Sequence, residues 1–337
     1  MLEIAVIGAG HWGPNLIRNF DNRLRSRVRW IIDRDESRLE AAAKRFPDAQ
    51  LGTDVEAVFA DRTLDAVVVA TPTDTHAALV RRALEVGLHV MVEKPLTADS
   101  VSARELSALA EEQGRVLLVG HVFVYNPAVR WVKQRMDAGE LGRIYYISSA
   151  RTNLGPIRTD VSASWDLAAQ DIAIFNYWLD GPPISASARG HAWINPGLQD
   201  AVFATFRYPG DILVHLHVSW LNPRKVREIT VVAEDKMLSY DDMDAMEPIR
   251  LFDKRVNVEE EFVDTFSGFR SVVHTGDITI PPVRMGEPLG AECMHFLDCI
   301  ENGETPNTGG PEGVEVVRAL EAMDRSMSQG GKEVPLA

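Results

Sequence analysis

The sequence predicts an α/β domain with a doubly wound parallel sheet, followed by an α+β domain with a large, mainly antiparallel open sheet. Three observations support this. The chain has 337 residues, which exceeds the size at which one hydrophobic core usually suffices. Short apolar runs alternate with amphipathic stretches up to about residue 120, and strands separated by short turns follow. We therefore expect one domain over residues 1–120 and a second over residues 121–337.

The strands expected in the first domain are short, apolar and rich in Val and Ile, as is typical of strands buried on both faces. They are Leu2–Gly8, Val28–Asp33, Ala66–Ala70, His89–Glu93 and Val116–Gly120. Helical stretches lie between them, for example Glu36–Arg45 and Thr75–Glu85. Strands that alternate with helices indicate a parallel sheet with right-handed crossovers.

The second domain begins with a different pattern. A helix over Ala128–Ala138, a strand over Ile144–Asn153 and a helix over Trp165–Leu179 come first. Strands of alternating character follow, joined by short turns rich in Pro, Gly, Asn and Asp, which predicts an antiparallel sheet. These strands are Ile184–Ala192, Ala201–Tyr208, Asp211–Trp220, Arg227–Ala233, Lys236–Asp241 and Ile249–Phe252. Two final helices, Glu287–Asn302 and Pro311–Ser328, can pack back on the first domain.

The composition excludes several classes of protein. Hydrophobic residues make up 45% and charged residues 25%, an ordinary globular profile that differs from fibrous and disordered chains. The net charge of −14 opposes binding to nucleic acid or to an anionic membrane surface. No apolar run approaches the ~20 residues that span a bilayer, and no basic leader precedes the first strand. Cys293 and Cys299 are too few for a disulfide framework and should be buried, so we expect a cytoplasmic protein.

A glycine-rich turn follows the first expected strand. Gly8, Gly10 and Gly13 fit the pattern G-x-G-x-x-G, and His11 and Trp12 lie between the last two. The first glycine permits the tight turn, the second permits close approach to a pyrophosphate, and the third lets helix and strand pack closely. The turn leads from a strand into a helix, whose first N–H groups can bind phosphate. We therefore expect a Rossmann dinucleotide site that includes His11 and Trp12.

An acidic residue accompanies this turn. Asp33 ends the second expected strand, 20 residues after Gly13. A carboxylate there accepts hydrogen bonds from the adenosine ribose and repels a 2′-phosphate, so NAD is the expected cofactor. Arg34 and Arg38 leave NADP open, because arginines at this edge can hold a 2′-phosphate; the alternative is a solvated helix face.

A lysine ends the strand His89–Glu93. In a doubly wound sheet the ligand lies at the carboxyl ends of the strands, so we expect Glu93 and Lys94 at the mouth of the cleft. The alternative is an ordinary surface lysine at a strand end. The loop after the strand Ala66–Ala70 should face the dinucleotide in the same way. Its candidate residues are Thr71, Pro72, Thr73 and His76.

These features resemble the glucose–fructose oxidoreductase/inositol dehydrogenase family, Gfo/Idh/MocA. The similarity extends over nearly the whole chain, and Glu93-Lys94-Pro95 is its most specific motif. Other segments that carry it are Gly8–Gly13, Ala70–His76, Gly120-His121, Asn126-Pro127, Pro288-Leu289 and Gly331. The resemblance implies that Lys94 is the catalytic acid/base beside the nicotinamide, and that the open sheet of the second domain serves oligomerisation. Trp220–Lys225 and Tyr240–Asp242 resemble the nucleotide-sugar 3-dehydrogenases within the family.

Family members carry an Asp-x-x-x-His pair on a helix of the second domain. The equivalent residues here are Asp166 and Gln170, so the acid is present and the histidine is absent. A spacing of four places both on one helical face, where both can contact one substrate. Histidine exchanges a proton near neutral pH, whereas an amide only donates and accepts hydrogen bonds. Catalysis by lysine alone, a specialised reductase chemistry and a deliberate substitution that traps a complex all remain open.

Further residues are candidates for binding. Tyr125 and Asn126 follow the last strand of the first domain, in a segment that resembles the family's crossover, and Asn126 should lie near substrate or nicotinamide. Arg158 precedes the second-domain helix and can reach a substrate anion, or is a solvated loop arginine. His215 and His217 share one strand face without a third ligand, so we expect no metal and a face that meets a partner subunit.

The sequence thus predicts an NAD(P)-dependent oxidoreductase that transfers hydride between nicotinamide and a hydroxyl or keto carbon of a sugar, cyclitol or nucleotide-sugar. Lys94 exchanges the hydroxyl proton, Asp166 hydrogen-bonds the substrate and balances Lys94, and Gln170 contacts the substrate. One alternative is a secondary-metabolism tailoring reductase that recognises a ketone or imine through Gln170. The other is an impaired or non-enzymatic dinucleotide-binding homologue. The expected partners are a sugar-like small molecule and copies of this chain, as a homodimer or homotetramer.

Overall fold

The structure is a computed structural model that describes residues 1–21, 24–263 and 266–336, with the side chains of 257–271 outside the description. The chain divides into two compact units. The first unit comprises Met1–Tyr125 and Glu287–Glu321, and the second comprises Asn126–Gly286 and Ala322–Ala337. The sequence predicts a boundary between residues 120 and 121, whereas the first compact unit extends to Tyr125 and the chain returns to it at Glu287.

The first unit is built on a six-stranded sheet in the order β3-β2-β1-β4-β5-β6. All neighbouring strands in it are parallel, which confirms the doubly wound α/β fold. Its strands are β1 (Leu2–Ile7), β2 (Ser26–Ile32), β3 (Gln50–Gly52), β4 (Ala66–Val69), β5 (His89–Glu93) and β6 (Leu117–Gly120). Every expected strand of this domain is present, and β3 was missed because three residues give no periodic signal.

Helices accompany this sheet, and those that precede β6 connect its strands. They are α1 (Gly13–Phe20), α2 (Glu36–Arg45), α3 (Glu56–Ala60), α4 (Thr73–Glu85), α5 (Ser100–Glu112), the 3₁₀ turn η1 (Val122–Tyr125) and α8 (Pro288–Asn302). Two of them begin at an aspartate that accepts a hydrogen bond from the first turn. Asp35 caps α2 through the N–H of Ser37, and Asp99 caps α5 through the N–H of Ser102.

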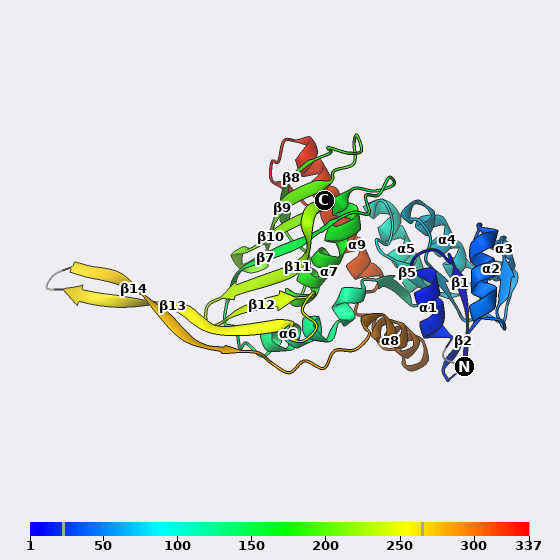
Figure 1. Cartoon of the computed structure of the whole chain (residues 1–337), viewed down its shortest axis with the longest axis horizontal. Helices are drawn as coiled ribbons and strands as arrows, with labels where there is room; N and C mark the ends of the chain where they lie inside the picture. Colours follow the sequence, from blue (N-terminus) through cyan, green and yellow to red (C-terminus); the bar gives the residue numbers. More distant parts are fainter. Residues whose placement is uncertain (22–23, 264–265, 337) are drawn as a thin grey trace. The chain divides into compact units, whose positions relative to one another are not determined.

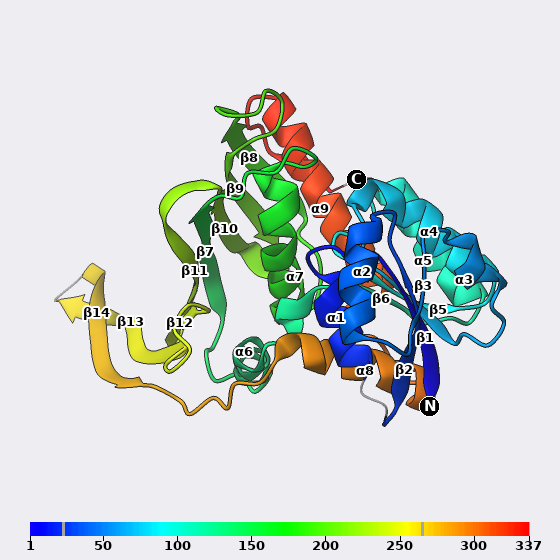
Figure 2. The ribbon, with the colours of Figure 1, turned by 45° about the vertical axis from the view of Figure 1, so that its right-hand side comes forward.

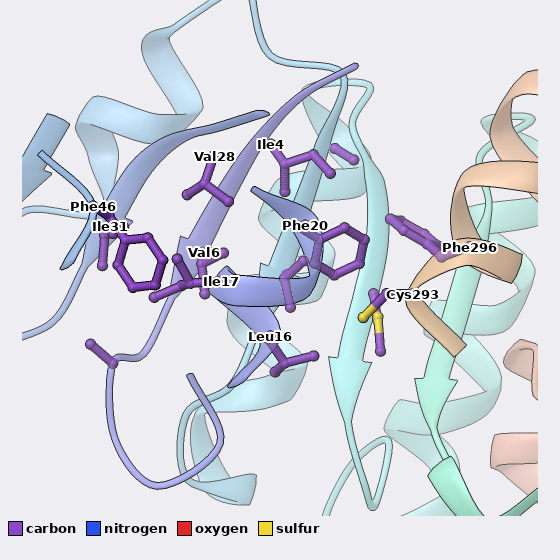
Figure 3. Packing of buried hydrophobic residues seen from close by; sticks show 14 of the residues in the cluster. Ile4, Val6, Leu16, Ile17, Phe20, Val28, Ile31, Phe46, Cys293 and Phe296 are labelled. Carbon is purple, nitrogen blue, oxygen red and sulfur yellow. The ribbon is translucent and has the colours of Figure 1, made fainter. Parts of the chain in front are cut away.

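The core of the first unit forms where α1 and α8 pack beside the sheet (Figure 3). Phe20 of α1 meets Phe296 of α8 edge to face, with ring centroids 6.0 Å apart. Cys293 and Cys299 of α8 are both buried free thiols, which confirms their expected place among apolar residues. Helix α8 therefore belongs to the same hydrophobic core as the Gly-rich helix α1.

The second unit contains a nine-stranded sheet in the order β14-β13-β12-β11-β7-β10-β9-β8-β15. Its strands are β7 (Ile144–Leu154), β8 (Ser185–His191), β9 (Ala201–Tyr208), β10 (Ile212–Ser219), β11 (Leu221–Ala233), β12 (Met237–Asp241), β13 (Ile249–Val263), β14 (Phe266–Thr279) and β15 (Val334–Pro335). All neighbours are antiparallel except β7 and β10. The expected large, mainly antiparallel sheet is thus confirmed.

Three strands of this sheet depart from the prediction. β11 begins at Leu221 rather than Arg227, with an irregular register between Leu221 and Val226. β13 continues well past Phe252 and pairs with β14, which was not predicted, in the long hairpin labelled in Figure 1. β15 is only two residues long, too short to be recognised by periodicity.

The helices of the second unit begin with α6 (Pro127–Asp137), whose N-cap is Asn126. The expected helix over Trp165–Leu179 is a π-helical turn, Ser164–Ala168, continued by α7 (Ala169–Trp178). Figure 2 shows α7 beside the strands of the nine-stranded sheet. The last helix, α9 (Gly310–Ser328), belongs to both units, with its residues up to Glu321 in the first and the rest in the second. None of the helices in the described residues is long and apolar enough to cross a membrane.

Candidate functional site

The glycine-rich turn has the conformation that its sequence predicts. Gly8 adopts a φ of +103°, and a Cβ added there would overlap the carbonyl oxygen of Ala70. A Cβ on Gly13 would in turn overlap the carbonyl oxygen of Gly8. Only glycine therefore allows β1, the turn and α1 to pack this closely. The turn leads directly into the N-terminus of α1, the end of a helix at which an anion is stabilised.

A cavity of about 620 Å³ adjoins this turn at the carboxyl ends of the strands. Six of the predicted cofactor ligands line it: Gly8, Gly10, Asp33, Arg34, Thr71 and Pro72. Apolar side chains of Ile32, Val55 and Leu79 also contribute to its wall. An apolar slot with a carboxylate beside it suits an adenosine, whose base needs apolar contact and whose ribose needs an acceptor. His11, Trp12, Gly13, Thr73, His76, Glu93 and Lys94 are not among the residues that line this cavity.

Asp33 is fixed by hydrogen bonds to the backbone of the site. Its Oδ2 accepts from the N–H of Ala9 at 2.7 Å, and its Oδ1 accepts from the N–H of Asp35 at 2.9 Å. Arg38 lies 3.4 Å from both Asp33 and Asp35 and keeps half of its side chain exposed. Of the two arginines that could hold a 2′-phosphate, Arg38 is therefore paired with the carboxylate that opposes such a phosphate, and Arg34 lines the cavity.

His76 is buried between two loops of the first unit. Its Nε2 lies 2.9 Å from the carbonyl oxygen of Thr71, and its Nδ1 lies 2.9 Å from that of Pro95. Burial lowers the pKa of this imidazole, so the ring is neutral near pH 7. The histidine thus joins the Thr71 loop to the Glu93-Lys94-Pro95 segment, in which the Lys94–Pro95 peptide bond is cis.

Lys94 follows β5 in a setting with other ionisable side chains. Glu93 stands opposite Gly120 in the pairing of β5 with β6, and its Oε2 accepts weakly from the N–H of Lys94 at 3.3 Å. Burial raises the pKa of Glu93 to about 7. Burial, helped by the charge of Lys94, lowers the pKa of His121 to about 3. Glu292 of α8 is fully buried, and burial together with Glu93 raises the pKa of its carboxyl well above the usual range.

In the second unit, Asp166 lies within the π-helical turn. Arg158 donates to its Oδ1 at 3.1 Å, and the indole N–H of Trp220 donates to its Oδ2 at 3.3 Å. Arg158 also pairs with Asp160, so this predicted anion ligand is held by two carboxylates. π-helical turns recur at functional sites, and this one positions an acid whose two oxygens both have donors.

Gln170 lies in the first turn of α7 and is buried, with an exposed fraction of 7%. Its Oε1 has no hydrogen-bond partner among the residues that the structure describes. Its neighbour Asp171 pairs with Arg151 of β7, at 2.7 Å from Nη2 and 3.0 Å from Nε. Gln170 therefore presents an acceptor that the protein itself does not satisfy, on a helix fixed to the sheet by an ion pair.

The remaining predicted substrate ligands, Tyr125 and Asn126, form hydrogen bonds with other residues of the protein. The Tyr125 hydroxyl is 3.0 Å from the Thr308 hydroxyl, and the ring is buried. Asn126 caps α6 by accepting from the N–H of Ala128 at 2.8 Å, and its amide donates to Asp242 at 3.2 Å. Neither observation assigns a substrate role to these residues.

The predicted alternation in β10 is confirmed. Val214, Leu216 and Val218 are buried, whereas His215 is exposed and His217 stacks on Phe203 with ring centroids 4.3 Å apart. Elsewhere, His295, Asp298 and Glu304 bring possible metal-ligand atoms within 4.8 Å of one another. The carboxylate of Asp298 already forms an ion pair with Arg25 at 2.8 Å, so this cluster does not by itself indicate a metal site.

Two family descriptions match the chain. Residues 2–121 match "Oxidoreductase family, NAD-binding Rossmann fold", and residues 129–239 match "GFO/IDH/MocA C-terminal domain". The chain belongs to the Gfo/Idh/MocA family. It is therefore an oxidoreductase, and residues 2–121 form its NAD-binding Rossmann domain.

Among similar proteins, the scyllo-inositol 2-dehydrogenase (NAD(+)) of Bacillus subtilis (strain 168) is 26% identical, over 90% of this chain and 88% of its own length. The UDP-N-acetylglucosamine 3-dehydrogenase of Acidithiobacillus ferrooxidans is also 26% identical, over 71% of this chain and 74% of its own length. The crystal structure of GenD2 from gentamicin A biosynthesis, in complex with NAD, has a TM-score of 0.82 and 25% identity, covering 99% of this chain and 97% of GenD2. The chain is equally identical to an inositol dehydrogenase and to a nucleotide-sugar dehydrogenase. These identities therefore do not favour the nucleotide-sugar enzymes over the inositol enzymes as relatives.

Sequence reasoning missed two side chains of these sites. Trp220 follows a strand and was noted only for its resemblance to a subgroup, although its indole bonds Asp166. Glu292 stands in an amphipathic helix, where a glutamate normally faces water. A glutamate flanked by the apolar positions Leu289, Cys293 and Phe296 is the signal that could have identified it as buried.

Proposed function

We propose that the protein is an NAD(H)-dependent dehydrogenase that acts on a hydroxyl or keto carbon of a sugar, cyclitol or nucleotide-sugar. One observation carries the proposal. The glycine-rich turn, Asp33 and Lys94 all lie at the carboxyl ends of strands of one parallel sheet in the first unit. In folds of this kind that edge is where a dinucleotide and the group that reacts with its substrate are found.

The cofactor would be held by residues of the first unit. Gly8 and Gly10 would admit the pyrophosphate, and Asp33 would accept from the adenosine ribose. When bound, the nicotinamide would take up or return the hydride. Asp33 and the pairing of Arg38 with it support NAD over NADP, because a 2′-phosphate would face a carboxylate and find this arginine occupied.

In this proposal Lys94 exchanges the proton of the substrate hydroxyl. As a neutral amine it takes the hydroxyl proton while the carbonyl forms, and as an ammonium it returns that proton in the reverse direction. Asp166 and Gln170 are the proposed substrate ligands of the second unit, and Arg158 and Trp220 already orient the oxygens of Asp166. The buried acceptor of Gln170 suits a hydroxyl or amine hydrogen of the substrate.

A tailoring reductase of secondary metabolism is the second candidate. It is favoured by Gln170 at the position of the family histidine, and by the likeness to GenD2, a protein of gentamicin A biosynthesis. In such an enzyme the amide would bind a keto or imine group without exchanging a proton with it. An inactive dinucleotide-binding homologue would bind NAD and turn over neither kind of substrate.

We also propose a homodimer or homotetramer that pairs through the nine-stranded sheet. Tyr146, Phe203 and Leu213 expose nearly half of their surfaces on neighbouring strands of that sheet. A sheet face with large exposed apolar side chains is usually covered in a stable protein. Light scattering at micromolar concentration tests this, and a monomer there would contradict it.

The activity itself is tested by following the absorbance of reduced nicotinamide with a panel of substrates. The panel contains inositols, free sugars and UDP-sugars with NAD, and the matching keto sugars with NADH. Turnover of an alcohol supports the first candidate, and turnover confined to keto or imino substrates supports the second. NAD binding by titration without any turnover would favour the inactive homologue.

A further inference from the structure

Two large apolar side chains of the second unit are exposed in the loop between β8 and β9. Trp193 and Ile194 expose 61% and 52% of their surfaces, in a loop that covers residues 192–199. The imidazole of His191 lies beside the indole, with ring centroids 4.7 Å apart. Adjacent exposed apolar side chains in a loop are typical of a binding surface, and the proposed reaction does not yet use these two.

A buried carboxylate holds this loop in place. Asp200 directly precedes β9 and is fully buried. Its Oδ2 accepts from the N–H of Trp193 at 2.5 Å and from the N–H of Ile194 at 2.9 Å. Its Oδ1 has no partner in the part of the chain that the structure describes. Backbone hydrogen bonds to a carboxylate are stronger than those to a neutral acceptor, so Asp200 fixes the two residues with exposed apolar side chains before any ligand binds.

Hydrogen bonds also connect this loop to Asp166, a proposed substrate ligand. The carbonyl oxygen of Asp200 accepts from the N–H of Trp220 at 2.9 Å, and the indole N–H of Trp220 donates to Asp166 Oδ2. A second route begins at Asn195, whose amide donates to the carbonyl oxygen of Arg158 at 3.0 Å. Arg158 in turn donates to Asp166 Oδ1. Each carboxylate oxygen of Asp166 is therefore joined to the loop through one intermediate residue.

The end of the loop is bonded to the segment that leads into the π-helical turn. The N–H of Ala163 donates to the carbonyl oxygen of Gln199 at 2.8 Å, directly before the turn Ser164–Ala168 begins. Asp166 is the third residue of that turn. Backbone and side-chain hydrogen bonds within one unit thus fix the loop that carries Trp193 relative to Asp166. A group bound on the indole would have a defined position relative to a substrate held by Asp166.

The chemistry of an exposed indole selects its ligand. The face of an indole stacks on a nucleobase, and it also packs on the apolar C–H face of a pyranose. Both ligands offer one flat ring face, and neither needs a charged partner at this place. A cyclitol or a free monosaccharide has a single ring, which the reacting centre would occupy. The loop therefore suits a substrate that carries a second ring beyond the one that reacts.

We propose that Trp193 and Ile194 form an outer subsite for a second ring of the substrate, joined to the reacting sugar. This rests on the proposed function, in which Asp166 binds that sugar. The second ring is the nucleobase of a nucleotide-sugar or the next sugar of a glycoside, and its flat face lies on the indole of Trp193. Asp200 is a positioning residue, because it acts through the loop. The subsite is remote from the reacting carbon and stabilises ground state and transition state equally, so it lowers KM and leaves kcat unchanged.

Binding to the full chain in the presence of NAD tests the subsite without turnover. The probes are UDP-glucose and maltose, which carry a second ring, and glucose and myo-inositol, which do not. At least one two-ring probe should bind the wild type more tightly than glucose does, and the one that does so identifies the source of the ring. Trp193→Ala should weaken its binding at least ~5-fold, the range of stacking on an aromatic side chain, and Trp193→Phe should keep most of the affinity. Trp131→Ala, a partly exposed tryptophan of α6, is the control and should leave it unchanged.

A second set of measurements tests the role of Asp200. The amides of Trp193 and Ile194 should exchange hydrogen slowly in the wild type and at least ~10-fold faster in Asp200→Ala, which loses their acceptor. The same variant should bind the two-ring probe as weakly as Trp193→Ala does. In steady-state rates, Trp193→Ala should raise KM for a two-ring substrate at unchanged kcat and alter neither constant for a one-ring substrate. Equal losses for one-ring and two-ring substrates would show a merely structural role and overturn the subsite.

The outcomes separate this inference from the proposed function. A wild type that binds neither two-ring probe more tightly than glucose, or Trp193→Ala with wild-type affinity, overturns the subsite and leaves the proposed activity intact. A change of oligomeric state in Trp193→Ala at unchanged probe affinity assigns the loop to contact between copies and likewise overturns it. Binding of UDP-glucose or maltose that depends on Trp193, without turnover of any substrate in the panel, supports the subsite and contradicts the proposed activity.

Discussion

Asp171 and Arg151 form a buried ion pair that joins α7 to β7. Arg151 Nη2 lies 2.7 Å from Asp171 Oδ1, and both side chains are almost fully buried. Both residues of the pair belong to the second unit. Because Asp171 follows Gln170 directly, the pair fixes the part of α7 that presents the proposed substrate ligand.

The first prediction concerns this pair. Asp171→Ala should lower the free energy of unfolding by about 3–5 kcal/mol, because the buried, charged Arg151 would lose the carboxylate that bonds it. Denaturant unfolding measures the change. Glu105→Ala, which breaks an exposed pair with Arg81, is the matched control and should cost no more than about 1 kcal/mol. Asp171→Leu combined with Arg151→Met should recover much of the loss, and equal effects of Asp171→Ala and Glu105→Ala would contradict the argument.

The second prediction is that Lys94 carries the proton chemistry. Lys94→Ala should lower turnover at least ~100-fold, the range of general acid–base catalysis, while NAD binding changes little. The binding should persist because Lys94 does not line the cavity that contains the Gly8 turn and Asp33. Stopped-flow or steady-state rates and a fluorescence titration measure the two effects. Lys44→Ala, an exposed lysine of α2, is the control. Turnover close to wild type in Lys94→Ala would remove Lys94 from the mechanism.

The third prediction concerns cofactor choice. NAD(H) should bind more tightly than NADP(H), because a 2′-phosphate would face Asp33 while Arg38 is paired with it. Asp33→Ser should narrow or reverse this preference for NAD(H), because it removes the negative charge and frees Arg38 from one of its two carboxylates. In Asp33→Ser combined with Arg38→Ala, the gain for NADP(H) should disappear. Titrations with both cofactors measure the ratio, and tighter NADP(H) binding by the wild type would show that Arg34 and Arg38 outweigh the acid.

The fold was more predictable than the contacts of the site. Continuous apolar strands and alternating strands leave a local signal, so both sheets could be predicted from sequence. β3 and β15 are too short for such a signal. Pro223 argues against a strand in its neighbourhood, so the start of β11 at Leu221 could not be predicted. The glycine-rich turn is local as well, and its cavity is where the motif placed it. The hydrogen bond from Trp220 to Asp166 and the full burial of Glu292 depend on which distant segments the fold brings together, and no local pattern encodes that.

The last prediction turns on Gln170, where the chain departs from its family. The residue is buried, and its Oε1 has no partner among the described side chains and backbone groups. If an amide is the functional choice, this oxygen accepts a hydrogen bond from the substrate, and Gln170→His should lower activity on the true substrate. If the amide marks a lost or removed histidine, the same change should raise turnover and add a pH dependence near about 6.5.

We expect Gln170→His to raise turnover on a sugar substrate, because the other residues that carry the resemblance to the family are present, Lys94 and Asp166 among them. Gln170→Glu is the matched variant, since it keeps the shape of the side chain and the acceptor but removes the amide donor. Rates measured across pH for the wild type and both variants distinguish the two cases. A pH limb that appears only in the histidine variant identifies proton exchange at this position. Unchanged rates in both variants would mean that residue 170 does not face the reacting carbon, and the substrate would then have to be held by other residues of the second unit.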